Sequence, residues 1–180
     1  MSEAMARWRV PLGWVLGLLA LWIAEPTRTY LLAGVLVAAA GEALRIWASG
    51  YLDKDRRLTT EGPYAWTRNP LYLGSLFVGL GFALATGKLV LLAVLAGLFA
   101  AIYIPVMKRE AARLEAAFPL DYSLYAARVP LLVPRVPREE GDRGVGYSWA
   151  RVRANREPVT VIGILVVVLI LWAKWRLLAP

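Results

Sequence analysis

Residues 71–107 read LYLGSLFVGLGFALATGKLVLLAVLAGLFAAIYIPVM and contain one charged residue, Lys88. Such an apolar stretch is typical of membrane-spanning helices, which need about 20 apolar residues each. The tripeptide 86–88 divides it into two runs, so we expect helices over 71–86 and 89–107 joined in a tight antiparallel hairpin. The hairpin would bring the segment before its first helix close to the segment after its second.

The rest of the chain continues this membrane pattern. The 180 residues are 59% hydrophobic, with a mean hydropathy of +0.53. Three further apolar runs lie at 10–24, 30–47 and 159–175, each near the length needed to cross the hydrocarbon. We therefore predict an all-α polytopic membrane bundle of about five transmembrane helices, with a cytoplasmic catalytic segment, in a single membrane domain over 1–180.

The basic residues are distributed unevenly between the loops of this bundle. The net charge is +8, and 17 of the 21 Lys and Arg residues lie in cytoplasmic segments if the N-terminus is cytoplasmic. The positive-inside rule then favours a cytoplasmic N-terminus and an external C-terminus. Because the charges sit between spans, we expect them to contact anionic membrane lipids and not nucleic acid. Nothing in the sequence predicts the oligomeric state.

The chain contains neither Cys nor His. Disulfides, thiolate nucleophiles, Ser-His triads and Cys- or His-ligated zinc or haem are therefore excluded. We predict no metal site, and any acid–base chemistry must use Asp, Glu, Lys, Tyr, Arg or the substrate itself.

A polar, aromatic segment leads into the hairpin at 61–75, EGPYAWTRNPLYLGS. Arg68 offers a planar fork of donors for a carboxylate or phosphate, and Asn69 can both donate and accept. The same residues also suit a helix start, with Asn69 as N-cap and Pro70 at the first position. Gly74 either leaves room for a flat ligand or lets helices pack closely.

The other end of the hairpin carries Lys108–Glu115, so Glu110 should reach the same cytoplasmic site. Its carboxylate either binds an ammonium or sulfonium group or pairs with Arg113 one turn away. In the second span, Glu42 and Arg45 either form a mutual salt bridge or line a substrate groove, since ionisable groups at membrane depth are costly.

The remaining polar segments are easier to interpret. We expect the charged residues of the 53–61 loop, including Arg57 and Glu61, to form a solvated face. The fourth helix should continue to Phe118, where Pro119 ends it. Tyr122 and Tyr125 then share one helical face. The Gly- and Pro-punctuated stretch 135–158 is predicted to be a cytoplasmic linker or flap, followed by an extra span at 159–176.

Over about residues 41–135, the chain resembles the integral-membrane methyltransferases related to isoprenylcysteine carboxyl methyltransferase and the phospholipid methyltransferases. The motifs that carry the resemblance are Arg45-Ile46-Trp47-Ala48, Gly62-Pro63-Tyr64, Arg68-Asn69-Pro70-Leu71-Tyr72-Leu73-Gly74, Glu110-Ala111, Phe118-Pro119, Tyr122-Ser123-Leu124-Tyr125 and Val129-Pro130 with Pro134. The family pattern commonly has His at position 69, a second Glu at 111 and Gly at 119.

The resemblance implies S-adenosylmethionine as cofactor and a lipophilic acceptor, such as an isoprenylcysteine-like carboxylate or a phospholipid amine, in a prokaryotic inner membrane. It implies three overlapping sets of site residues. Catalysis would use Arg68, Glu110 and Arg45. Cofactor contacts would come from Tyr64, Asn69, Pro70, Tyr72, Gly74, Glu110, Tyr122 and Tyr125. The acceptor groove would be bordered by Arg45, Trp47 and Arg128.

Two alternatives remain open at this point. Membrane sterol reductases have a similar Pro-x-Tyr-x-Gly hairpin but bind NADPH, and a non-enzymatic relative could keep the fold after losing the chemistry. The replacements Ala111 and Pro119 are the features that favour the second alternative.

Overall fold

The computed structural model describes residues 13, 15–53, 57–136 and 146–178. Residues 15–23 are helical, and the labelled elements then follow in chain order. They are α2 (Arg28–Ser49), the 3-10 helix η1 (Gly62–Ala65), α3 (Pro70–Ala85), α4 (Val90–Ala117), α5 (Pro119–Arg128), α6 (Trp149–Ala154) and α7 (Glu157–Leu178). The described part of the chain contains no strand, as the sequence predicts.

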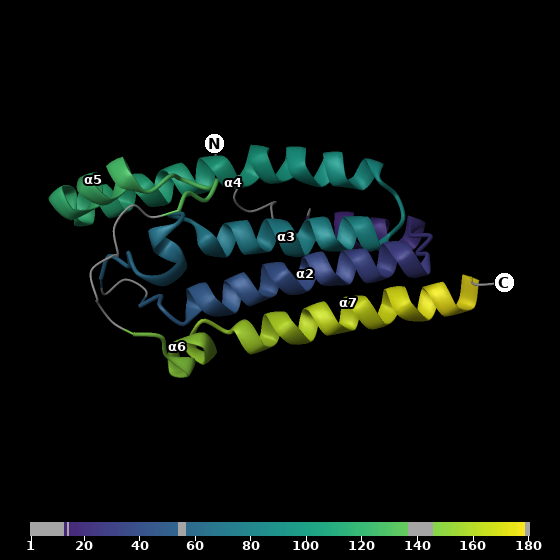
Figure 1. Cartoon of the computed structure of the whole chain (residues 1–180). Coiled ribbons are helices and arrows are strands. Elements are labelled where there is room, and N and C mark those ends of the chain that lie inside the picture. The colour runs from purple at the N-terminus through teal and green to yellow at the C-terminus, as the bar shows by residue number, and fades with distance from the viewer. Residues whose placement is uncertain (1–12, 14, 54–56, 137–145, 179–180) are drawn as a thin grey trace.

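Four long helices lie side by side in the order α4, α3, α2, α7, and the short helices α5 and α6 gather at one end (Figure 1). Helices α2, α4 and α7 are long and apolar enough to span a membrane, whereas α3 is apolar but has 16 residues. The predicted spans at 30–47, 71–86, 89–107 and 159–175 all appear as helices. The first predicted span begins at residue 10, outside the described residues, and its remainder is helical over 15–23.

Helices α2 and α3 pack through glycines that bring their backbones into contact. A Cβ built on Gly34 would lie 2.3 Å from the carbonyl oxygen of Gly81, and one on Gly41 would lie 2.6 Å from that of Gly74. Without a hydrophobic driving force between helices in lipid, such close packing is a main source of association. The packing interpretation of Gly74 is thus confirmed, and this contact fixes the start of α3 against α2.

Substituting Gly34 should therefore destabilise the bundle. Gly34→Ala places a methyl group against the backbone of α3, and we expect a loss of about 1–3 kcal/mol, as for other overpacked sites. Thermal unfolding in detergent measures this loss. The matched control is Gly97→Ala in α4, where a Cβ would meet nothing within 4 Å. An equal melting temperature for the two variants would contradict the packing role.

The predicted hairpin between α3 and α4 is confirmed. Gly87 adopts φ +76°, and its amide donates to the Leu84 carbonyl. Positive φ is readily available to glycine, so the chain reverses within three residues. Pro105 lies inside α4 without ending it, and the helix runs to Ala117, immediately before Phe118 as expected. The start of α3 and the last turns of α4 therefore meet at one end of the bundle.

The 135–158 stretch departs from the prediction of a linker. Residues 137–145 lie outside the described residues, but 149–154 form α6. The Ser148 amide and the Arg151 Nε both donate to the Gly50 carbonyl, at 2.9 and 2.8 Å. These bonds satisfy a carbonyl at the C-terminal end of α2, where helices leave acceptors unpaired. The segment is thus docked on α2, and α7 starts directly beside it.

Candidate functional site

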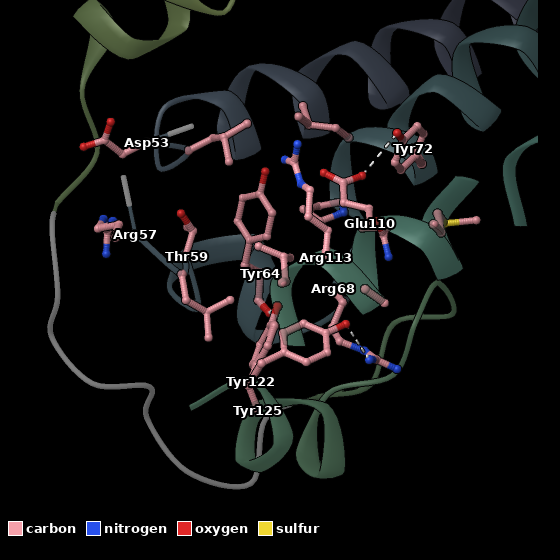
Figure 2. Close-up of a pocket in the computed structure, with 18 of the residues that line it drawn as sticks. Asp53, Arg57, Thr59, Tyr64, Arg68, Tyr72, Glu110, Arg113, Tyr122 and Tyr125 are labelled. Atoms are coloured by element: carbon pink, nitrogen blue, oxygen red, sulfur yellow. Dashed lines mark hydrogen bonds between the residues drawn. The ribbon is translucent and has the colours of Figure 1, made fainter. Parts of the chain in front are cut away.

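A polar cavity of about 580 Å³ lies at the end of the bundle where α3 begins and α4 continues beyond the apolar region. Figure 2 shows side chains from η1, α3, α4 and α5 pointing into it. Nine of the residues singled out from the sequence line the cavity: Arg45, Tyr64, Arg68, Asn69, Pro70, Tyr72, Glu110, Tyr122 and Tyr125. This volume is in the range of small-molecule sites.

The Tyr72–Glu110 pair joins the two ends of the hairpin. Tyr72 on α3 donates its hydroxyl hydrogen to Glu110 Oε2 on α4 at 3.3 Å (Figure 2). Behind it, the Tyr72 ring lies 5.6 Å from the Tyr103 ring, which stacks on Phe99. The predicted convergence of Glu110 with the 68–74 segment is therefore confirmed, and the carboxylate is held inside the cavity wall.

Arg68 also lines the cavity. Its Nη1 donates to the Tyr122 hydroxyl at 3.0 Å, and its guanidinium carbon lies 5.8 Å from the centre of that ring. Tyr125 donates to the Tyr64 carbonyl at 2.8 Å. Both α5 tyrosines are buried and share one helical face, as predicted. Helix α5 is thereby attached to the loop that carries Arg68.

Asn69 is the N-cap residue of α3, and its carbonyl accepts from the Leu73 amide at 3.0 Å, with Pro70 as the first helical residue. The predicted helix start is therefore confirmed, but the Asn69 side chain makes no capping hydrogen bond. Instead, Asn69 Nδ2 donates to the Leu131 carbonyl at 2.9 Å, and the Arg68 amide donates to the Pro130 carbonyl at 2.9 Å. These two hydrogen bonds therefore hold the segment after α5 against the residues that line the cavity.

Burial changes the acid–base properties of two of these tyrosines. Burial is the main cause that raises the pKa of Tyr64 well above its ordinary value, and the negative charge of Glu110 raises it further. Burial is also the main cause that raises the pKa of Tyr125, and the neighbouring Tyr64 adds to this increase. Both phenols therefore stay protonated at neutral pH, and neither can act there as a base.

Several buried polar atoms along the cavity have no hydrogen-bond partner. They include the Nε atoms of Arg57 and Arg68 and the Oγ1 of Thr59, all on cavity-lining residues. Buried polar groups are nearly always paired, so a cluster of unpaired ones calls for an explanation. A polar ligand in the cavity would supply the missing partners.

The loop at 53–61 differs from the solvated face that the sequence predicted. Residues 54–56 lie outside the described residues, but Asp53, Arg57 and Thr59 line the cavity and do not form a solvated face. Arg57 Nη1 donates to Glu61 Oε1 at 2.6 Å. Burial would raise the pKa of Glu61, but the bonds from Arg57 and from the amides of Glu61 and Thr60 together lower it. This ion pair therefore adds stability above about pH 4.5, and the stability is lost as the pH falls through the lowered pKa.

Arg45 both forms a salt bridge and lines the cavity, so the two interpretations of its role are compatible. Its Nε is 3.3 Å from Glu42 Oε2, so the mutual salt bridge is present, and its side chain also lines the cavity. Nη1 donates to Ser75 Oγ at 2.6 Å, and Nη2 contacts both carboxylate oxygens of Glu157 at 3.0 Å. Sequence reasoning missed Glu157, Ser75 and Asn155 as lining residues.

Three predicted residues do not line this cavity. Gly74 faces Gly41 and the Arg45 side chain across the helix contact. Trp47 is partly exposed and meets Trp66 edge to face at 6.2 Å. Arg128 lies at the exposed end of α5. Any direct role for these residues in ligand binding stays a prediction.

A second cavity, of about 510 Å³, lies between the N-terminal helix, α3, α4 and α7. Its walls are almost entirely aliphatic and aromatic, with Leu16, Leu95 and Leu171 among them. Ser75 and Tyr103 line both cavities. The polar cavity therefore adjoins an apolar space within the membrane-spanning part of the bundle.

The hydrogen bond from Tyr125 to Tyr64 can be tested directly. Tyr125→Phe removes the donor and leaves a buried carbonyl oxygen unpaired, which should cost about 1–2 kcal/mol. Thermal unfolding in detergent should show a lower melting temperature for this variant than for Tyr147→Phe, a control at a partly exposed tyrosine. Equal melting temperatures would mean that α5 is not held through this bond.

Comparisons with known proteins agree with this geometry. Residues 26–120 match the family model described as phospholipid methyltransferase, a range that contains α2, α3 and α4 and most of the residues that line the polar cavity. No solved structure matches the chain with significant similarity.

Two curated proteins are similar to the chain. One is the cobalt-zinc-cadmium resistance protein CzcN of Cupriavidus metallidurans, 33% identical over 150 residues, which are 82% of this chain and 68% of CzcN. The other is the nickel-cobalt-cadmium resistance protein NccN of Alcaligenes xylosoxydans xylosoxydans, 36% identical over 118 residues, which are 64% of this chain and 53% of NccN. The matched regions thus leave about a third of CzcN and about half of NccN uncovered.

Proposed function

Because this integral membrane protein belongs to the phospholipid methyltransferase family, we propose that it transfers a methyl group from S-adenosylmethionine to a lipophilic acceptor at the cytoplasmic membrane face. The observation that carries the proposal is the polar cavity, whose wall includes both Glu110 and Arg68, the latter with an unpaired Nε. These groups complement a ligand that bears a cationic centre and a carboxylate.

The residues present fit such a cofactor. Glu110, held by Tyr72, would bind its ammonium or sulfonium, since a carboxylate favours a nearby cation. Arg68 would bind its carboxylate with the donors that it does not use toward Tyr122. The unpaired Arg57 Nε and Thr59 Oγ1 would form hydrogen bonds with polar groups at the other end of the cofactor. Tyr64 adds an aromatic surface between them.

The cofactor would supply an already activated methyl group, so the protein needs mainly to position the reactants. Glu110 and Arg68 would each hold one charged group of the ligand, and buried Tyr122 and Tyr125 would limit the entry of water. Since Tyr64 and Tyr125 stay protonated, Glu110 is the better candidate to accept a proton from an amine acceptor.

The apolar cavity suggests where the acceptor would bind. A hydrocarbon chain in that cavity would have its reactive end near Ser75 and Tyr103, which border both spaces. Arg45 at this junction is already flanked by the carboxylates of Glu42 and Glu157. An anionic acceptor would compete with these groups for the guanidinium, so the arrangement favours an amine headgroup over a carboxylate.

Ligand binding by the full chain tests the proposal against its alternatives. In nanodiscs, S-adenosylhomocysteine should bind and raise the melting temperature, whereas NADPH should do neither. Stabilisation by NADPH alone would support the reductase alternative instead. No binding of either ligand at millimolar concentration would support a relative that has lost its chemistry.

The similarity to CzcN and NccN supports a second, physiological proposal. Those relatives are named for resistance to cobalt, zinc, cadmium and nickel. This chain contains no Cys or His, which are the ligands that such metals prefer. We propose that any contribution of this chain to metal resistance acts through methylated membrane lipids. A strain expressing a variant that cannot bind the cofactor should then be as metal-sensitive as one lacking the protein.

A further inference from the structure

Glu157 is the first residue of α7 and lies outside the region matched by the family model. It is 2% exposed, yet it lines the floor of the polar cavity. Its two carboxylate oxygens each lie 3.0 Å from Arg45 Nη2. The last helix therefore contributes a buried carboxylate to a site built mainly from the family region.

This carboxylate largely determines how the Arg45 fork is oriented. The contact between Arg45 Nε and Glu42 does not meet hydrogen-bond geometry, and both Glu42 oxygens remain without a hydrogen-bond partner. The guanidinium instead donates its hydrogen bonds to the Glu157 carboxylate and to Ser75 Oγ. Because Ser75 borders both cavities, Glu157 holds the guanidinium at their junction.

The chain places Glu157 through a specific local structure. Arg156 adopts φ +60°, which costs a non-glycine residue about 1 kcal/mol or more. Asn155 Nδ2 donates to the carbonyls of Ser49 and Leu52 at the end of α2. Most of α7 is not buried in the bundle, so these polar contacts, with those of Glu157, position the start of the helix.

We propose that Glu157 is a positioning residue for the methyl acceptor. By holding Arg45 at the junction, it shapes the passage between the apolar cavity and the polar cavity. It lies on the acceptor side of the site, whereas Arg68 and Glu110 form the cofactor side. This inference rests on the proposed methyl transfer and adds a residue that the family region does not contain.

The test uses the full chain in nanodiscs, labelled S-adenosylmethionine and a bacterial polar lipid extract as the acceptor probe. Glu157→Gln keeps the side-chain size but removes the charge. We expect the apparent KM for the extract to rise about tenfold, the magnitude of losing one charged hydrogen bond. The Kd for S-adenosylhomocysteine should change less than twofold. Glu157→Asp should restore part of the loss.

Two further variants separate positioning from simple structural support. Arg151→Gln removes a bond between α6 and the Gly50 carbonyl away from the cavity, and it should leave the apparent KM unchanged. In an Arg45→Gln background, Glu157→Gln should have no additional effect, because it acts through Arg45.

The inference would be overturned if Glu157→Gln left the apparent KM unchanged, or weakened cofactor binding as much as acceptor binding. It would also be overturned if Arg151→Gln reproduced the effect. A wild-type protein that bound no S-adenosylhomocysteine would contradict the proposed function itself, which distinguishes the two failures.

Discussion

Replacing Glu110 by glutamine should weaken the binding of S-adenosylhomocysteine by about 10- to 100-fold, the effect of losing a charged hydrogen bond. The side chain lines the cavity and accepts from Tyr72, so the variant keeps the shape and removes the charge. Methyl transfer should fall at least as much, since in the proposed complex the same group would face the cationic end of the ligand. Isothermal titration calorimetry in nanodiscs measures the first effect.

The matched control is Glu115→Gln, because Glu115 is exposed on the same helix and does not line the cavity. It should bind the ligand like the wild type. If both variants bound with unchanged affinity, Glu110 would not be part of the cofactor site, and the assignment of the cavity would have to change.

The second large effect is expected for Arg68→Ala. This change removes the bond to Tyr122 and the unpaired Nε together. We expect a 10- to 100-fold higher Kd for S-adenosylhomocysteine, as for other lost charged contacts. The melting temperature of the free protein should also fall, because the Tyr122 hydroxyl loses its partner.

Arg68→Lys separates charge from geometry. Lysine keeps the charge but cannot present a planar fork, so affinity should recover only in part. The exposed Arg153→Ala is the control and should change neither affinity nor melting temperature. Full recovery of affinity in Arg68→Lys would show that only a positive charge is needed at this position.

The membrane helices and the main elements of the site could be predicted because their signals are local. Long uncharged runs separated by three residues define the α3–α4 hairpin, and the hairpin by itself brings Tyr72 to Glu110. The three-residue spacing of Tyr122 and Tyr125 likewise places both on one buried helical face.

Contacts that depend on distant parts of the chain could not be predicted in this way. Arg45 and Glu157 are separated by 112 residues, and no periodicity connects them. Arg57 and Thr59 have the composition of a solvated loop, so only their position in the fold reveals that they line the cavity. Helix α6 has six residues in a Gly- and Pro-rich region and gives no periodic signal.

The contact between α2 and α3 was not predicted, but it left a trace in the sequence. Glycines recur seven residues apart in both helices that pack most closely, at Gly34 and Gly41 in α2 and at Gly74 and Gly81 in α3. A seven-residue interval returns to nearly the same helical face. Matching the two pairs would have predicted which helices meet, in addition to the packing role of Gly74 that the sequence already suggested.

The proposed function is tested most directly by following the labelled methyl group of S-adenosylmethionine into the organic-soluble fraction of a bacterial lipid extract. We expect the full chain in nanodiscs to transfer the label to an amine-bearing lipid, and Glu110→Gln to reduce the transfer at least tenfold relative to Glu115→Gln. Transfer by the wild type and Glu110→Gln at equal rates, or no transfer by a wild type that also fails to bind S-adenosylhomocysteine, would contradict the proposed function.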